Sequence, residues 1–307
     1  MTKFVFYTDL HLTAKTPCHR VDNYPQAVLA KLRQVYAIAK DEGADFILFG
    51  GDFYNAHRIF SYSLITEAML MICGFDVPTF GVVGQHDLYG YNPTSYPKST
   101  LAFQETHCLR FESLKVPLET DDAIIYPCHV YDDLIECLHQ RTTKKKKSVL
   151  VAHHLISKDE FPFQTFRTCD LNAANFNLVL SGDLHGGFET HTIKGTTFAN
   201  PGSLARQSVR DIDRMPKVLV VEIEAGESIQ IREVVLDAPK GEDVFGTTFL
   251  EDAQAIIADR EVDASDFVAQ LEALRQDAVD IYDLVDKVCK GQGIRLEVRD
   301  YILSKKP

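Results

Sequence analysis

The chain has 307 residues, of which 45% are hydrophobic, and this length can bury one large core or one core with a smaller appendage. Its formal net charge of −12 argues against a general nucleic-acid binder, because phosphate contacts require local positive charge, although metal ions could supply that charge for a polyanionic substrate. No apolar run approaches the roughly 18–20 residues of a membrane span, and the start has no signal-peptide pattern, so we expect a cytoplasmic protein (host cytoplasm if viral) without membrane association.

In the first ninety residues, apolar runs rich in strand-forming residues alternate with segments in which apolar residues recur at helical spacing. The pattern predicts strand, helix, strand, helix and strand at residues 3–9, 23–43, 44–52, 61–75 and 77–87. Continuous apolar strands separated by amphipathic helices predict a mainly parallel sheet that is covered on both faces.

The rest of the chain contains further strands and a final helix. Strands are predicted at 123–130, 147–154 and 176–185, with antiparallel strands in 190–202 and a hairpin at 217–236. Residues 268–288 form an acidic, strongly periodic pattern that predicts a helix without catalytic residues.

Five of the predicted strands end in ionisable or amide residues, in the sequences TDLH, GGDFYN, GQHD, AHH and GDLH. Strand carboxyl ends line the ligand crevice of open α/β sheets, so we expect these loops to converge. Carboxylate, imidazole and amide groups bind divalent first-row metals, and the absence of cysteine favours manganese or iron over a structural zinc. One such residue alone would be read as a turn cap or a hydrogen-bonded core residue, but five strand ends in series favour a common site. The candidates are Asp9, His11, Asp52, Gln85, His86, His153, Asp183 and His185.

These motifs resemble a known superfamily in their order and spacing. Asp9-Leu10-His11, Gly51-Asp52, the Gly-x-His-Asp of 84–87, His153 and the Gly-x-x-His of 182–185 are similar to the five blocks of the calcineurin-like metallophosphoesterases. Within that superfamily the segments GGDFYNAHR, GQHDLYGYN and NPGSLAR resemble the DNA repair exonucleases. These comprise bacterial SbcD, the nuclease subunit of the meiotic-recombination break-repair complex, and bacteriophage relatives.

The resemblance implies an α/β protein with a four-layer α-β-β-α sandwich and a small C-terminal extension of strands and a helix. The nuclease core would span residues 1–205. Residues 206–245 would add a strand pair that completes the sheet or caps the DNA groove. Residues 246–307 would form a helical segment that binds a partner or packs on its own domain.

The resemblance also implies two divalent cations, with manganese expected first and magnesium or iron(II) as alternatives. Asp52 would bridge them. The first cation would be completed by Asp9, His11 and His185, and the second by Gln85, His153 and Asp183. His86 would lie near the scissile phosphate, with Asp87 orienting its ring. The expected reaction is attack of an activated water on a phosphodiester, with His86 as the general acid.

Three positions depart from the superfamily pattern. Gln85 replaces the usual Asn and keeps an amide oxygen on a longer stem. Asp183 replaces the usual His and makes the second site harder and more negative. Asn55 replaces a His that normally follows the bridging Asp, and His57 either takes that role or is a surface histidine. These departures put the geometry of the second cation in doubt without removing the site.

The segment NPGSLAR contains three further candidates for substrate binding. Asn200 and Ser203 could donate hydrogen bonds to phosphate oxygens, and Arg206 could clamp a phosphate through two parallel hydrogen bonds. The alternative is a plain Pro-Gly turn.

The main functional hypothesis is a manganese-dependent DNA exonuclease or endonuclease of the SbcD type, which processes DNA ends together with an SbcC-type coiled-coil ATPase. One alternative is a phosphodiesterase or phosphatase for a small substrate. Another is a weakly active DNA-end scaffold for the ATPase, motivated by Gln85 and Asp183. The apolar helix at 61–75 is either part of the core or the contact of a homodimer.

Overall fold

The computed structural model describes residues 1–17, 20–140, 142, 145–161, 165–208, 211–224 and 226–246. The predicted acidic helix at 268–288, and almost all of the predicted segment 246–307, lie outside the described residues. Among the described residues, no helix combines the length and the apolar character needed to cross a bilayer.

The first of two six-stranded sheets combines strands from both ends of the described chain. Its strands β1, β2, β3 and β4 are parallel to one another, whereas β13 runs antiparallel to both β1 and β14. The strands in spatial order are β14 (Gln230–Val235), β13 (Lys217–Ile223), β1 (Thr2–Tyr7), β2 (Phe46–Phe49), β3 (Thr79–Gly81) and β4 (Phe111–Ser113). The hairpin predicted at 217–236 therefore extends this sheet by pairing with the first strand.

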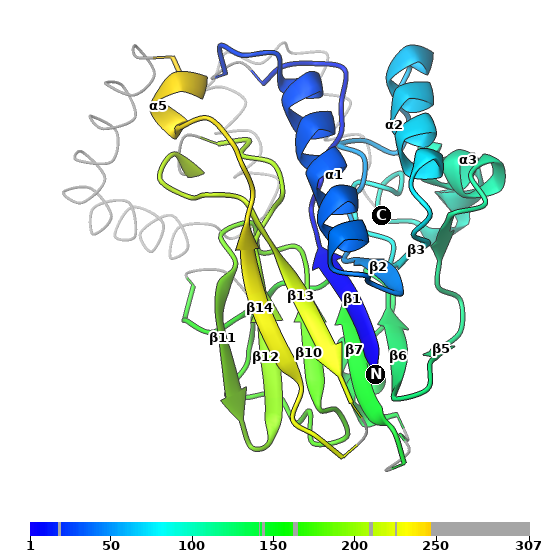
Figure 1. Cartoon of the computed structure of the whole chain (residues 1–307), viewed down its shortest axis with the longest axis vertical. Helices are drawn as coiled ribbons and strands as arrows, with labels where there is room; N and C mark the ends of the chain where they lie inside the picture. Colours follow the sequence, from blue (N-terminus) through cyan, green and yellow to red (C-terminus); the bar gives the residue numbers. More distant parts are fainter. Residues whose placement is uncertain are drawn as a thin grey trace, which may run out of the picture. The chain divides into compact units, whose positions relative to one another are not determined.

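The second sheet is also mixed. Its central strands β12, β10, β7 and β6 are parallel, and an antiparallel strand pairs at each edge. The strands in spatial order are β11 (Phe188–Ile193), β12 (Thr196–Asn200), β10 (Leu178–Ser181), β7 (Lys147–Ala152), β6 (Ala123–Cys128) and β5 (Leu118–Glu119). Figure 1 shows both sheets with their strands running along the long axis of the view.

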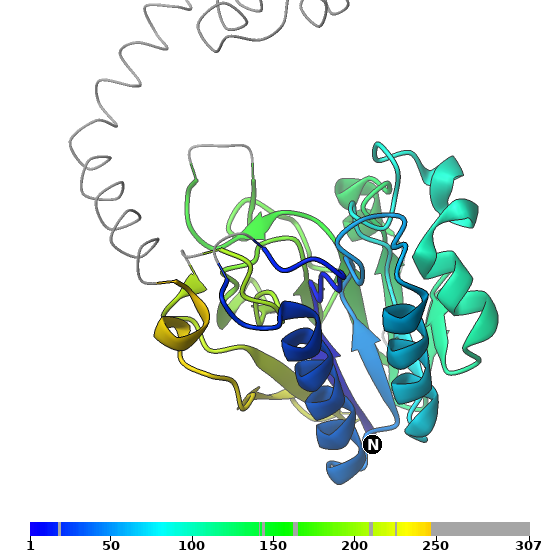
Figure 2. The same cartoon turned by 90° about the horizontal axis from the view of Figure 1, so that it is seen from above.

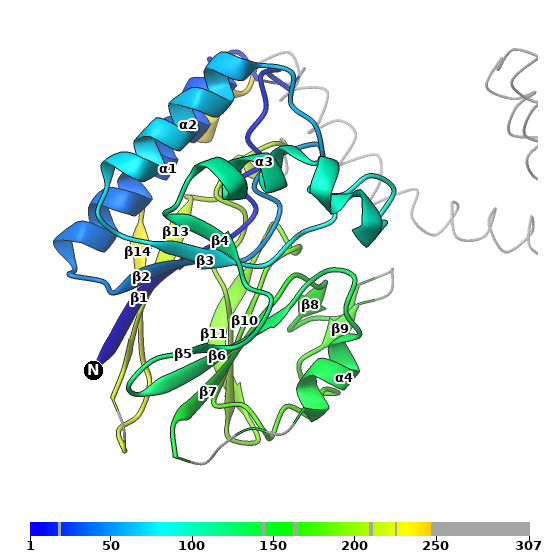
Figure 3. The same ribbon diagram turned by 90° about the vertical axis from the view of Figure 1, so that its right-hand side faces the viewer.

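Helices and short strands complete the described chain. Helices α1 and α2 lie side by side on the first sheet (Figure 2). Figure 3 shows that these helices and α4 lie on opposite outer sides of the pair of sheets. The remaining elements are α1 (Tyr24–Asp41), α2 (Tyr62–Gly74), η1 (Pro93–Lys98), α3 (Thr100–His107), α4 (Leu134–His139), β8 (Ile156–Ser157), β9 (Phe166–Arg167) and α5 (Gly241–Val244).

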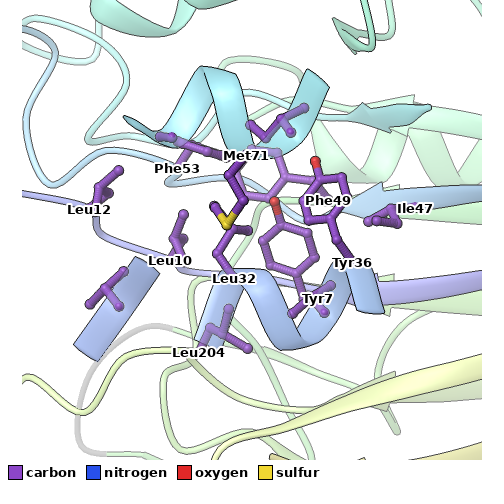
Figure 4. Close-up of a cluster of buried hydrophobic side chains, with 14 of the residues drawn as sticks. Tyr7, Leu10, Leu12, Leu32, Tyr36, Ile47, Phe49, Phe53, Met71 and Leu204 are labelled. Atoms are coloured by element: carbon purple, nitrogen blue, oxygen red, sulfur yellow. The ribbon is translucent and has the colours of Figure 1, made fainter. Parts of the chain in front are cut away.

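Alternation along the strands divides the interior into three hydrophobic layers. Val5 and Tyr7 of β1 pack against α1 and α2, in the cluster drawn in Figure 4. Phe4 and Phe6 point the other way and pack against strands of the second sheet. A third layer joins the outer face of the second sheet to α4, with Leu134 among its members. The predicted four-layer α-β-β-α sandwich is confirmed.

The sequence pattern by itself predicted a mainly parallel sheet covered on both faces. Strands β1, β2 and β3 are parallel and both faces are covered, but one face is covered by a second sheet, which the pattern did not predict. Strands of both sheets are apolar on both faces because one face meets helices and the other meets the opposite sheet. A continuous apolar run does not distinguish a covering helix from a covering sheet.

Helix α2 is divided between core and surface. Leu64, Ile65 and Ile72 are buried against the first sheet, whereas Tyr62 is 80% exposed and Leu70 is 69% exposed. The helix predicted at 61–75 therefore contributes to the core, and its exposed apolar side chains are compatible with a dimer contact, which stays a prediction.

Candidate metal centre

Seven of the predicted residues lie in the loops that follow five strands, β1, β2 and β3 of one sheet and β7 and β10 of the other. Four of them have a left-handed backbone, with φ values of 52° for Asp9, 48° for His11, 56° for Asp52 and 72° for Asp183. Only six non-glycine residues of the described chain have positive φ. Such backbone strain concentrates at functional sites, where the surrounding structure holds it in place. We call Asp9, His11, Asp52, Gln85, His153, Asp183 and His185 the strand-end cluster.

Glycines allow the loops of the two sheets to approach each other. A Cβ atom at Gly51, whose φ is 103°, would lie 2.2 Å from Nδ1 of His153. A Cβ atom at Gly84 would lie 2.1 Å from Oδ1 of Asp52. Any other residue at either position would collide with a member of the cluster, so both glycines are required for the geometry of the site.

Asp9, His11 and His185 bring three donor atoms together. The Nε2 atoms of His11 and His185 are 3.0 Å apart, and Oδ1 of Asp9 lies 3.6 Å from the first and 3.5 Å from the second. Ligand atoms at about 2.1 Å from an octahedral cation are about 3.0 Å apart. The observed separations therefore match the spacing of atoms that surround one small cation.

Asp52 lies between this group and His153. Its Oδ2 atom is 3.8 Å from Nε2 of His11 and 3.5 Å from Nε2 of His153, while its Oδ1 atom accepts a 2.8 Å hydrogen bond from the backbone N–H of His86. The ring of His153 donates from Nδ1 to the carbonyl of Gly50 at 2.6 Å, which leaves Nε2 free as a metal ligand. Asp52 thus lies between His11 and His153, and its role as the bridge between two cations stays a prediction.

Gln85 and Asp183 contact each other at the edge of the cluster. The amide Nε2 of Gln85 donates to Oδ1 of Asp183 at 2.6 Å, and the amide oxygen of Gln85 is buried without a partner. The backbone N–H of Asp183 donates to Oδ2 of Asp9 at 3.1 Å. Asp9, Asp52 and His153 belong to groups of three acidic or histidine side chains that could hold a metal ion. In the described chain, none of these groups contains Asp183.

The cluster contains buried polar atoms that have no hydrogen-bond partner among the described residues. They are Oδ1 of Asp9, Nδ1 of His11, Oδ2 of Asp52, Oε1 of Gln85 and Nε2 of His153. Burying a polar atom without a hydrogen-bond partner costs free energy. Several such unpaired atoms that lie close together therefore indicate that a ligand binds there. Because these atoms are carboxylate and amide oxygens and imidazole nitrogens, the residues fit divalent cations.

The charges within the cluster influence one another strongly. Burial alone raises the pKa of Asp9, but hydrogen bonds from His11 and His185 outweigh burial and hold that pKa well below its usual value. Burial lowers the pKa of His153, but the carboxylates of Asp52 and Asp9 outweigh it and raise that pKa to about 10. Protonated histidines thus neutralise the carboxylates when no cation does so.

His86 is exposed at the edge of the cluster, next to His11, and the centroids of the two rings are 4.9 Å apart. Its Nδ1 atom donates to the carbonyl of Asn55 at 3.1 Å, which leaves Nε2 available to a substrate. The predicted role of Asp87 as the group that orients this ring was wrong, because the Asn55 carbonyl holds the ring.

The Asp87 carboxylate instead fastens two strand-end loops together. It is fully buried and accepts backbone hydrogen bonds from Gly84 at 3.0 Å, Asp52 at 3.1 Å and Tyr54 at 3.3 Å. Burial and the charge of Asp52 raise the pKa of Asp87 to about 7. The position of Asp87 next to His86 in the sequence is therefore explained by its role in stabilising the loops.

The segment NPGSLAR is buried, and most of its polar side-chain atoms bond to the protein itself, although Nε of Arg206 has no partner among the described residues. Oδ1 of Asn200 accepts from Gly202 N at 2.8 Å, and the Ser203 hydroxyl bonds to the carbonyls of Asp9 and Ala205. Arg206 is 1% exposed and donates to the carbonyls of Ile212 and Pro239. The prediction that these three residues contact phosphate was wrong, and the alternative of a structural turn is the one observed.

Asn55 and His57 lie on the side of the site where His86 is exposed. The side-chain oxygen of Asn55 accepts from Gln207 at 2.9 Å, and its main-chain carbonyl holds His86. The ring of His57 packs on Tyr89 with centroids 5.0 Å apart. Both side chains line a hollow that also contains His86. A substrate role for either remains a prediction.

Two residues that support the cluster were missed by sequence reasoning. The hydroxyl of Thr8 donates to Oδ2 of Asp9 at 2.6 Å, and Gln207 fixes the side chain of Asn55. Thr8 adjoins the first motif, so its position gave a usable signal. Gln207 is 152 residues from Asn55, and nothing in the sequence links the two.

The sequence matches the calcineurin-like phosphoesterases over residues 2–187, which is more than half of the chain. The chain therefore belongs to the calcineurin-like phosphoesterase family. It is a metal-dependent phosphoester hydrolase with a fold that binds two divalent cations. The match does not distinguish the DNA repair exonuclease branch from other members.

Similar solved structures include three hydrolases at low identity. A dimetal phosphatase from Danio rerio is 10% identical, with 77% of this chain and 99% of that chain covered and a TM-score of 0.47. The phosphoesterase YfkN from Bacillus subtilis is 12% identical, with 78% and 93% covered and a TM-score of 0.46. The phosphopantetheinyl hydrolase of Mycobacterium tuberculosis is 16% identical, with 78% and 98% covered and a TM-score of 0.45. No curated protein matches the chain by sequence.

Proposed function

We propose that the protein is a two-metal phosphodiesterase that acts on a nucleotide-type substrate small enough to be turned over without a second subunit. The observation that carries this proposal is the convergence of unpaired buried ligand atoms of Asp9, Asp52 and His153 beside the exposed ring of His86. Family membership supports phosphoester hydrolysis. A small phosphodiester is a simple substrate that agrees with both observations.

The residues divide into metal ligands and groups that face the substrate. Asp9, His11 and His185 would hold one cation, and Asp52 with His153 would hold the other, completed by the amide oxygen of Gln85. Cations bound there supply positive charge that neutralises a phosphoester and favours the ionisation of water. We assign manganese, because the second group is rich in oxygen ligands.

His86 would protonate the leaving oxygen of the phosphodiester. Its Nδ1–H bond to the Asn55 carbonyl fixes the ring so that Nε2 faces outward and can carry the transferred proton. After the proton transfer, Nδ1–H of the neutral ring still donates to the Asn55 carbonyl, so the ring need not rotate between turnovers. A general acid of this kind contributes roughly 10²–10⁴-fold to the rate.

The second candidate is the DNA exonuclease or endonuclease of the SbcD type, working with an SbcC-type ATPase. It is favoured by exposed Tyr89 and Tyr91 next to His86, since aromatic side chains stack on unpaired bases. A homodimer through the exposed side chains of residues 61–75 belongs to the same hypothesis. The scaffold alternative requires an incomplete second metal group, and it is favoured by the absence of Asp183 from the groups of possible metal ligands in the described chain.

The test is hydrolysis by the purified full chain with added manganese. The substrates are p-nitrophenyl phosphate, bis-p-nitrophenyl phosphate, and labelled single- and double-stranded DNA. Turnover of the diester above that of the monoester supports the proposal, and rapid degradation of both DNA forms shifts the assignment to the nuclease. No turnover of any substrate, with fewer than two manganese ions bound, would leave the scaffold alternative.

A further inference from the structure

Two hollows adjoin each other next to the strand-end cluster. The first, about 320 Å³, is lined by His86 and Gln85 among others. The second, about 350 Å³, is lined by His57, Arg58, Tyr89, Thr94, Ser95 and Lys98, and we call it the Arg58 hollow. Both are lined by His57 and Tyr89. A substrate whose reacting phosphate lies at His86 can therefore extend past these two rings into the Arg58 hollow.

Hydrogen bonds hold the walls of the Arg58 hollow in place. Nε of Arg58 donates to the carbonyl of Lys98 at 3.2 Å, which orients the guanidinium group. The backbone N–H of Tyr89 donates to the Ser95 hydroxyl at 2.9 Å. The carbonyl of His57 accepts from the backbone of Thr100 at 2.7 Å. A binding surface that is already ordered loses less conformational entropy when a ligand binds.

The Arg58 hollow is positively charged in an acidic protein. Arg58 and Lys98 are both exposed, and within the described part of the chain neither forms an ion pair. Most of the other described arginines are paired with carboxylates or bonded to carbonyls through their terminal nitrogens. The hydroxyls of Thr94 and Ser95 already donate to Asn92, so the phosphate contacts of this hollow would come from Arg58 and Lys98. Two cations without ion-pair partners are suited to a phosphate group.

Aromatic rings lie between the two hollows and at the edge of the site. Tyr89 is 68% exposed and Tyr91 is 70% exposed, and the turn that carries them uses left-handed backbone at Gly90, with φ of 56°, and at Tyr91, with φ of 59°. Positive φ at Tyr91 is unfavourable for a bulky residue. Exposed rings next to cationic side chains are the usual arrangement for stacking nucleobases between phosphate contacts.

We propose that the Arg58 hollow binds the phosphate adjacent to the scissile one, with the intervening base stacked on Tyr89. The substrate is then a nucleotide chain that carries at least two phosphates, the reacting one at His86 and its neighbour at Arg58 and Lys98. This inference rests on the proposed phosphodiesterase function and makes its substrate class more specific.

The test compares dithymidine monophosphate with the same dinucleotide carrying an additional phosphate at its 5′ or 3′ end, using manganese as the cofactor. We expect the kcat/KM of one phosphorylated form to exceed that of the unphosphorylated form by roughly tenfold, as for a hydrogen-bonded charged contact. In the double variant Arg58→Gln, Lys98→Gln this ratio should fall toward one. The matched control is Arg33→Gln, Lys40→Gln, at two exposed basic residues of α1, which should retain the ratio.

A binding measurement separates this inference from the proposed function. Calorimetry with thymidine 3′,5′-bisphosphate, in the presence of manganese, should give roughly tenfold weaker binding to the Arg58, Lys98 variant than to the unchanged protein. Equal binding by the two proteins, or a kcat/KM ratio that persists in the double variant, would overturn the Arg58 hollow while leaving the phosphodiesterase intact. Failure to hydrolyse any diester, with the binding difference retained, would overturn only the proposed function.

Discussion

The strand-end cluster and the segment 200–206 are both rich in polar side chains, and both were predicted to be functional. They differ in what their buried polar atoms contact. In the cluster, atoms of Asp9, Asp52 and His153 all lack partners among the described residues. In segment 200–206, Ser203 and the terminal nitrogens of Arg206 bond to backbone carbonyls, and only Nε of Arg206 is unpaired within the described chain. Unpaired buried atoms that converge indicate a ligand, and paired ones indicate structure. The residue types alone do not make this distinction.

The largest expected effect is that of Asp52→Asn at the centre of the cluster. The amide keeps the size of the carboxylate but removes the charge shared between His11 and His153, so turnover of bis-p-nitrophenyl phosphate should be lost. Manganese stoichiometry, measured by calorimetry, should fall from two toward one. Two bound ions together with undiminished activity would show that Asp52 is not the bridge.

His86→Gln tests the division between ligands and the group that faces the substrate. Because Nδ1 bonds to Asn55 and the ring is exposed, kcat should fall by roughly 10²–10⁴-fold. Manganese binding should stay nearly unchanged, although a nitrogen of His86 lies near ligand atoms of His11 and Asp52. Loss of a bound ion in this variant would make His86 a ligand and would require another general acid.

Much of the cluster could be predicted because each ligand lies in a short motif directly after its strand. Asp9 and His11 follow β1, and Asp52 follows β2, so the parallel pairing of these strands brings them to one edge. The partners of Arg206 could not be predicted, since Pro239 lies 33 residues away. For the same reason the sequence left open whether the strand pair within 206–245 completes the sheet or caps the DNA groove, because the pairing of β13 with β1 joins Phe6 to Leu219.

Arg206→Ala should affect stability rather than substrate binding. The side chain is 1% exposed, so its removal leaves a cavity and unpaired carbonyls, at a cost of about 2–3 kcal/mol of unfolding free energy. The KM for bis-p-nitrophenyl phosphate should not change. Urea denaturation and steady-state kinetics measure the two quantities, with exposed Arg33→Ala as the control. A KM raised tenfold at unchanged stability would restore the predicted phosphate clamp.

Asp183→His should change the metal preference of the cluster. The substitution removes the acceptor of the Gln85 amide and supplies an imidazole nitrogen, which zinc prefers more strongly than manganese does. We expect the ratio of zinc-supported to manganese-supported activity to rise by about tenfold, the size typical of changes next to a metal site. Metal titrations of both proteins measure this ratio, and an equal ratio would show that residue 183 does not influence the metal.

The smallest expected effect concerns Lys31, which is buried near Arg206 and whose ammonium group has no partner among the described residues. Burial lowers the pKa of Lys31 to about 7, and the charges of Arg20, Arg206 and Arg214 act in the same direction. Between that value and the unfolded pKa of about 10.4, the unfolded chain binds more protons than the native protein. The free energy of unfolding should therefore rise with pH across this window, by at most about 1.4 kcal/mol per pH unit from this residue.

Comparison of the unchanged protein with Lys31→Met isolates that contribution, because methionine keeps most of the aliphatic stem and cannot be protonated. Urea unfolding at pH 7, 8 and 9 should show a flatter pH dependence in the variant, and a gain in stability that is largest near pH 7. The exposed Lys40→Met, on the same helix, should follow the unchanged protein. Parallel curves for all three proteins would mean that Lys31 keeps its charge in the folded state and is paired with a group outside the described residues. The surroundings of segment 200–206 would then depend on a counter-charge, as the strand-end cluster depends on its cations.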